Sequence, residues 1–90
     1  MAKILVVDDS ALMRRLLVQV LQGAGYEVKT ARTGTEAVAE LVAWQPDAVT
    51  LDINMPEMDG LTALSLIMSA RPTPVVICLL YTSPSPRDLS

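Results

Sequence analysis

Three aspartates are the residues of this sequence best suited to chemistry. Asp8 and Asp9 directly follow the apolar run Ile4–Val7, and Asp52 ends a second largely apolar run that begins near residue 47. Clustered carboxylates suit a hard cation, and Mg²⁺ binds proteins through one or two carboxylates plus water and phosphate oxygens. A carboxylate beside such an ion can also attack phosphorus and form an aspartyl-phosphate. If the fold brings these positions together, the residues therefore predict Mg²⁺-dependent phosphoryl chemistry.

Each of these features also has a purely structural explanation. Asp8 and Asp9 could cap a helix, and Asp52 could begin a turn. The segment 55–60 could be only a tight connection with Gly60 in a left-handed conformation. Their joint placement after two strands favours a shared site. Like charges about 5 Å apart repel by about 3 kcal/mol at an effective dielectric near 20, so a site of this kind calls for a bound cation.

Composition narrows the class of protein. Ninety residues form one small domain, and 51% of them are apolar, so a buried core is expected. The net charge of −3 disfavours nucleic acid as a partner. Cys78 is the sole cysteine and histidine is absent, which excludes disulfide frameworks, Cys/His zinc sites and Ser-His or Cys-His catalysis. The first apolar run is too short for a signal peptide or a membrane span, so we expect a cytoplasmic protein with no membrane partner.

The hydrophobic pattern alternates between the period of a strand and that of a helix. The predicted order is strand 4–7, helix 12–21, strand 26–30, a helix opened by Thr33 and broken by Pro46, strand 47–52, helix 61–71 and a strand beginning at 74–77. This β-α-β-α-β-α-β order predicts an α/β fold with a doubly wound parallel sheet. In the strand order 2-1-3-4-5 the first and third strands are neighbours, so the three aspartates would meet in one crevice.

The helices and strands also carry finer expectations. In the first helix Leu12, Leu16 and Val20 belong to an apolar stripe, and Arg14 and Arg15 take the opposite, solvent-facing side. In the second helix the inward residues are predicted to be Ala37, Val38, Leu41 and Val42. Strand 26–30 should lie near a sheet edge because Glu27 and Lys29 interrupt it.

Two motifs carry a family resemblance. Residues 4–10, Ile-Leu-Val-Val-Asp-Asp-Ser, and residues 51–61, Leu-Asp-Ile-Asn-Met-Pro-Glu-Met-Asp-Gly-Leu, strongly resemble the receiver domain of two-component response regulators. The resemblance implies a flavodoxin-like receiver fold, and we expect an incomplete receiver domain over residues 1–77. Within the family, residues 8–15 and 71–76 are most similar to the receivers of chemotaxis protein-glutamate methylesterases. The chain would then be a signalling module rather than an enzyme, although its intact parent would be a methylesterase.

The resemblance also implies roles for individual residues. Asp52 would be the phospho-acceptor. Asp9 and Asp52 would ligate Mg²⁺ directly, Asp8 would act through water, and the backbone carbonyl of Asn54 would complete the protein ligands. The implied partners are a histidine kinase, of the chemotaxis type, and the output domain of the intact protein.

The carboxyl-terminal part departs from the family pattern. Receivers place a Ser or Thr at the end of the fourth strand, where this chain has Leu79 and Leu80, and a Lys after a fifth strand, for which no residue is available. Residues 78–88 resemble a translated sequencing adapter, so we expect residues 78–90 to be an artefactual tail and the fold to be truncated after its fourth strand. The apolar stripe of the first helix would then face water in part, and the chain would be marginally stable and prone to associate.

Three other functions compete with the receiver. An aspartate-nucleophile phosphohydrolase would need an Asp-x-Asp motif after the first strand, whereas Asp52-Ile53-Asn54 follows the third and offers an amide. A flavin-binding domain would need a Ser/Thr/Gly-rich phosphate loop where Asp8 and Asp9 stand. The last alternative is a non-functional fragment of a methylesterase regulator.

Overall fold

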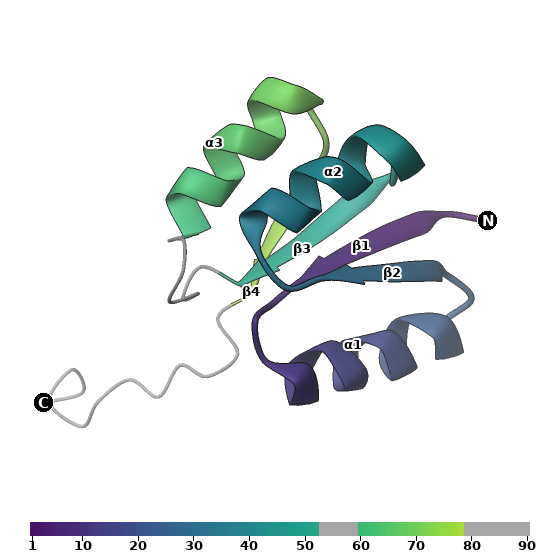
Figure 1. Ribbon diagram of the computed structural model, residues 1–90. Coiled ribbons are helices and arrows are strands. Elements are labelled where there is room, and N and C mark those ends of the chain that lie inside the picture. The colour runs from purple at the N-terminus through teal and green to yellow at the C-terminus, as the bar shows by residue number, and fades with distance from the viewer. Residues whose placement is uncertain (53–59, 79–90) are drawn as a thin grey trace, which may run out of the picture.

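The structure is a computed structural model that describes residues 1–52 and 60–78 (Figure 1). Strands and helices alternate along the described chain: β1 (Lys3–Val7), α1 (Ala11–Gly23), β2 (Glu27–Ala31), α2 (Gly34–Trp44), β3 (Ala48–Asp52), α3 (Gly60–Ala70) and β4 (Val75–Cys78). The strands form one sheet in the order β2-β1-β3-β4, and all three pairings are parallel. The predicted element order and strand order are therefore confirmed for these residues.

Helices cover both faces of the sheet. Helix α1 lies on one face, and α2 and α3 lie side by side on the other (Figure 1). The main core fills the space between the sheet and the α2–α3 layer, and its buried residues are Leu5, Val7, Ala31, Ala37, Leu41, Val49, Leu51, Ala63 and Ile67. This arrangement confirms the doubly wound α/β fold.

Position in the sheet explains the composition of each strand. β1 lies between β2 and β3, and its residues Leu5, Val6 and Val7 are almost completely buried, as an apolar run between two helical layers should be. β2 lies at the edge, as its charged residues predicted, although it runs from Glu27 to Ala31 rather than from 26 to 30. The shift of one residue is an ordinary boundary error.

Helix α1 begins directly after Ser10 and ends at Gly23. The Ser10 hydroxyl caps it by accepting a 3.3 Å hydrogen bond from the Met13 N–H, and Gly25, with φ of 97°, ends the turn that follows. Its outward side is apolar: Leu12 is 62% and Val20 66% exposed. The partial exposure expected for the α1 stripe is therefore observed.

Helix α2 begins at the predicted cap Thr33, but the set of residues that it buries differs from the prediction. The Thr33 hydroxyl accepts from the Glu36 N–H at 3.1 Å, and the Glu36 carboxylate accepts from the Arg32 N–H at 2.9 Å. Val42, predicted to face inward, is 60% exposed, so that prediction was wrong. Leu41 is fully buried, and each residue of a helix is rotated by about 100° from the one before, which carries Val42 out of the core.

Several predictions fall on residues outside the described ranges. The role of Asn54, the shape of the loop after Asp52, the Leu79 and Leu80 positions and most of the proposed tail belong to this group, because the structure does not describe residues 53–59 and 79–90. Within the described residues, none of the helices is both long and apolar enough to cross a membrane.

Candidate functional site

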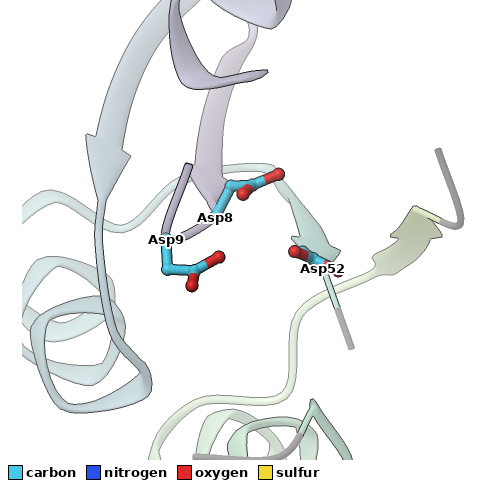
Figure 2. Close-up of side chains that lie close together, drawn as sticks. All are labelled: Asp8, Asp9 and Asp52. Carbon is cyan, nitrogen blue, oxygen red and sulfur yellow. The ribbon is translucent and has the colours of Figure 1, made fainter. Parts of the chain in front are cut away.

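The three aspartates meet at the carboxyl ends of β1 and β3. The two strands are parallel neighbours with Val7 opposite Leu51, so Asp8 and Asp52 occupy adjacent positions at one end of the sheet. Each aspartate, including Asp9, offers a carboxylate oxygen, and these oxygens all lie within 4.8 Å of one another. Figure 2 shows the three side chains gathered around one space between the strand ends. The convergence expected from the strand order is therefore present, while the role of each residue stays a prediction.

The three carboxylates differ in their surroundings. Asp8 is 3% exposed, whereas Asp9 and Asp52 are more open to solvent. Burial raises the pKa of Asp8, and the negative charges of Asp52 and Asp9 raise it further. The Ser10 N–H and the Arg14 guanidinium oppose that rise but do not cancel it. Three carboxylates this close together repel one another, and a bound cation would relieve that repulsion.

Backbone and side-chain hydrogen bonds hold Asp8 in place. Its carboxylate accepts a 2.8 Å bond from the Ser10 N–H, and its own N–H donates to the Ala31 carbonyl at 3.1 Å. Its carbonyl accepts from the Arg14 Nη1 at 2.7 Å. The residue is thereby tied to β2, to the start of α1 and to the second turn of that helix, so its carboxylate has a defined direction.

Arg14 is the residue near the site that the sequence reasoning missed. It was assigned to the solvent-facing side of the first helix together with Arg15, but in the structure it is partly buried and bound to Asp8. Helical side chains lean toward the amino terminus, so a long side chain in the second turn can reach the loop before the helix. The position of Arg14 four residues after the cap Ser10 was the signal available in the sequence.

The donor set fits a hard divalent ion such as Mg²⁺ better than zinc or copper. Three carboxylates close together offer oxygen atoms only, whereas zinc and copper sites in proteins draw on imidazole or thiolate. A small oxygen-seeking cation held by carboxylates usually retains several waters, which leaves positions for phosphate oxygens. The arrangement can therefore bind a divalent ion beside a carboxylate able to attack phosphorus.

Comparison with protein families gives one assignment. The family model for the response regulator receiver domain matches residues 4–86. The match continues past residue 77, where the sequence reasoning ended the domain. Since residues 79–90 lie outside the described structure, that boundary stays a prediction.

Curated relatives agree with the family model. A protein-glutamate methylesterase/protein-glutamine glutaminase 3 of Rhodospirillum rubrum is 60% identical over 78 residues, which are 86% of this chain and 21% of the relative. A protein-glutamate methylesterase/protein-glutamine glutaminase of Archaeoglobus fulgidus is 54% identical over 87 residues, which are 96% of this chain and 25% of the relative. The chain thus spans about a quarter or less of the length of these relatives.

Solved structures share the fold. The response regulator domain of Thermotoga maritima CheB has a TM-score of 0.82 at 36% identity, covering 99% of this chain and 69% of that one. The Vibrio cholerae chemotaxis protein CheY4 has a TM-score of 0.84 at 38% identity, covering 97% and 75% respectively. The similarity therefore extends over nearly all of this chain.

Proposed function

The chain belongs to the response regulator receiver domain family, and from that premise we propose that it accepts a phosphoryl group from a histidine kinase on Asp52. The observation that carries the proposal is the gathering of Asp8, Asp9 and Asp52 within 4.8 Å at the ends of two adjacent strands. The similarity of the chain to chemotaxis proteins supports a chemotaxis histidine kinase as the donor of the phosphoryl group. The cytoplasmic location expected from the sequence stays part of this proposal.

Asp52 is the best placed of the three to act as nucleophile. It is the last residue of β3, a strand held between β1 and β4, so its backbone is fixed on both sides. Asp8 is less suitable because it is almost completely buried. Asp9 lies beyond the end of β1, in the short connection to α1.

The three carboxylates would divide the chemistry between them. Asp8, Asp9 and Asp52 would hold Mg²⁺, with the Asn54 carbonyl as the further ligand that the family resemblance implies. When bound, the ion would spread the charge of the transferring phosphoryl group. A carboxylate oxygen of Asp52 forms the new bond to phosphorus as the phosphorus–nitrogen bond of the phosphohistidine breaks. The imidazole nitrogen leaves with the bonding electron pair and takes up a proton.

The chain would act as the input module of a longer protein. Its relatives are protein-glutamate methylesterases of which it spans 21% to 25%. We infer that phosphorylation of this module controls a methylesterase output domain in the intact protein. The module itself is a signalling domain, and it is the shift between two conformational states that would carry the signal.

Labelling with a small phosphodonor tests the proposal. Incubating the purified chain with acetyl phosphate and Mg²⁺ should add one phosphoryl group, seen by intact mass, and a chelator should abolish the addition. Asp52→Asn should remove the label. Asp47→Asn is the matched control, because Asp47 lies at the opposite end of β3 and bonds the Lys3 N–H at 2.7 Å. Label that persists in Asp52→Asn, or that is lost in Asp47→Asn alone, contradicts the role of Asp52.

A further inference from the structure

The peptide bond between Asp8 and Asp9 joins two of the three residues that gather at the candidate cation site. Its carbonyl belongs to Asp8 and accepts the 2.7 Å hydrogen bond from the Arg14 Nη1. A peptide unit is planar, so a hydrogen bond that fixes the direction of the carbonyl also fixes the plane from which the Asp9 backbone continues. Arg14 therefore acts on the geometry of Asp9 as well as on that of Asp8.

The hydrogen bonds at Asp8 hold different parts of the residue. Its N–H donates to the Ala31 carbonyl at 3.1 Å, which fixes the peptide before it, and its carboxylate accepts from the Ser10 N–H at 2.8 Å. The Arg14 bond fixes the peptide after it. The direction of the Asp9 carboxylate depends on that second peptide, and Figure 2 shows this carboxylate turned toward the space that the three aspartates share.

The charges of α1 indicate that Arg14 does not stand there to stabilise the helix. The first turn has no acidic residue and the last turn has no basic one, while Arg14 and Arg15 both lie in the amino-terminal half. Positive charge is favoured near the carboxyl end of a helix instead. Arg15 is exposed, whereas Arg14 is partly buried and bound to Asp8. Departures from a local preference are expected where a tertiary contact or a function requires them.

The charge of Arg14, taken alone, would oppose a bound cation. The guanidinium lowers the pKa of Asp8, so its charge is felt at that carboxylate. The same charge repels a cation held there. If Arg14 acted only through its charge, its removal would strengthen cation binding. If it acts by orienting the backbone, its removal weakens binding, so the sign of the change separates the two effects.

We propose that Arg14 is a positioning residue for divalent-cation binding, because its hydrogen bond holds the Asp8–Asp9 peptide in the orientation that turns both carboxylates to the ion. The proposal rests on the proposed function, since it concerns the same Mg²⁺ site. Without the bond the peptide samples several orientations, and only the fraction with the correct one binds the ion. Replacing a group that orients metal ligands typically weakens metal binding 10–100-fold.

The Kd for Mg²⁺ of Arg14→Gln tests the proposal. This variant is expected to be less stable than the parent, so the Kd is taken from the increase in the free energy of unfolding in urea as Mg²⁺ is added. That increase depends on the Kd and the ion concentration and not on the starting stability. Sucrose favours the folded state of every chain, and potassium chloride keeps the ionic strength constant. The Kd should rise by about tenfold, the lower end of the usual range, because the lost positive charge offsets part of the effect.

Two further variants separate the bond from the charge. Arg15→Gln removes the same charge from the exposed neighbouring position, and its Kd should stay within about twofold of the parent because exposed charges are screened by salt. Arg14→Lys keeps the charge but replaces the planar guanidinium with an ammonium on a shorter side chain. Its Kd should rise by about threefold, between the parent and Arg14→Gln, because the ammonium recovers the bond only in part.

Three results would overturn the role of Arg14. The first is a Kd in Arg14→Gln that equals or falls below that of the parent, and the second is an Arg15→Gln chain that loses as much affinity as Arg14→Gln. The third is an Arg14→Lys chain with the Kd of the parent, which decides the question even if Arg14→Gln does not fold.

The same titrations separate this proposal from the proposed function. An unmodified chain that binds no Mg²⁺ would overturn both. A chain that binds Mg²⁺ and takes up the phosphoryl group on Asp52, with the same Kd in parent and Arg14 variants, would overturn only the role of Arg14.

Discussion

The Arg14 Nη1 donates a 2.7 Å hydrogen bond to the backbone carbonyl of Asp8. The bond joins the second turn of α1 to the end of β1, and so connects the outer helix with the acidic cluster. The positive charge of Arg14 also lowers the pKa of Asp8, against the larger effect of burial. The Arg14 side chain thus both holds the backbone at Asp8 and partly offsets the negative charge around the Asp8 carboxylate.

Replacing Arg14 should therefore weaken the fold. Arg14→Gln loses a charge-assisted hydrogen bond and should lower the free energy of unfolding by about 1.5–3 kcal/mol. The exposed neighbour Arg15 is the matched control, and Arg15→Gln should change stability by less than about 0.5 kcal/mol. Urea denaturation of both variants measures the difference, and equal stabilities would argue against the bond.

Mg²⁺ should stabilise the folded chain. Binding to the native state alone raises the free energy of unfolding by about 2.7 kcal/mol at an ion concentration 100 times the Kd. Thermal unfolding with Mg²⁺, compared with potassium chloride at equal ionic strength, measures the effect. Asp9→Asn and Asp52→Asn should each reduce it strongly. Glu27→Gln, at the far end of the β2 edge, should leave it intact, and a general loss in all three variants would contradict a specific site.

Without divalent ions, stability should rise as the pH falls through the raised pKa of Asp8. Burial makes the folded state bind this proton more tightly than the unfolded state. Between that raised pKa and the ordinary aspartate value of about 3.9, the folded state carries more protons, so acidification favours folding. Above the raised pKa, Asp8 is charged in the folded state, and the loss of stability caused by burying that charge is then complete.

Asp8→Asn checks this pH dependence. The amide keeps an oxygen for the Ser10 N–H and removes the buried charge, so the variant should be more stable than the parent at neutral pH. The advantage should shrink toward acid pH. Urea midpoints at several pH values in a chelator give the difference between the two chains, and an advantage independent of pH would contradict the raised pKa.

Adjacent residues of α2 should respond very differently to truncation. Leu41 is completely buried, so Leu41→Ala should cost about 2–5 kcal/mol. Val42 is 60% exposed, and Val42→Ala should stay within about 0.5 kcal/mol of the parent. Chemical denaturation of the two variants tests the observed orientation of the helix, and a large loss for Val42→Ala would support the inward placement that the sequence pattern favoured.

Local patterns were enough to predict the elements, whereas the strand order was taken from known doubly wound sheets and was confirmed by the structure. The apolar run before Asp8, the Thr33 cap and the break at Pro46 each act within a few residues, so their effects can be read without knowledge of the rest of the chain. The convergence of Asp8 and Asp52 was also predictable, because the carboxyl ends of parallel neighbours meet at one edge.

The misplaced side chains show the limit of such patterns. Val42 belongs to an apolar pair on α2, and only the packing of that helix against the sheet and α3 decides which of the pair is buried. Arg14 is charged and was therefore expected to face solvent. Its hydrogen bond to the Asp8 carbonyl depends on where the end of β1 lies relative to the helix.

By itself, the sequence determined the order of strands and helices, the parallel sheet and the presence of three carboxylates at the ends of two strands, because these follow from periodicity and chain connectivity. Tertiary structure decided how deeply Asp8 is buried, which way Arg14 turns and which residue of the pair Leu41 and Val42 is buried. Those properties depend on contacts between residues far apart in the chain, and local sequence patterns do not give the distances between such residues.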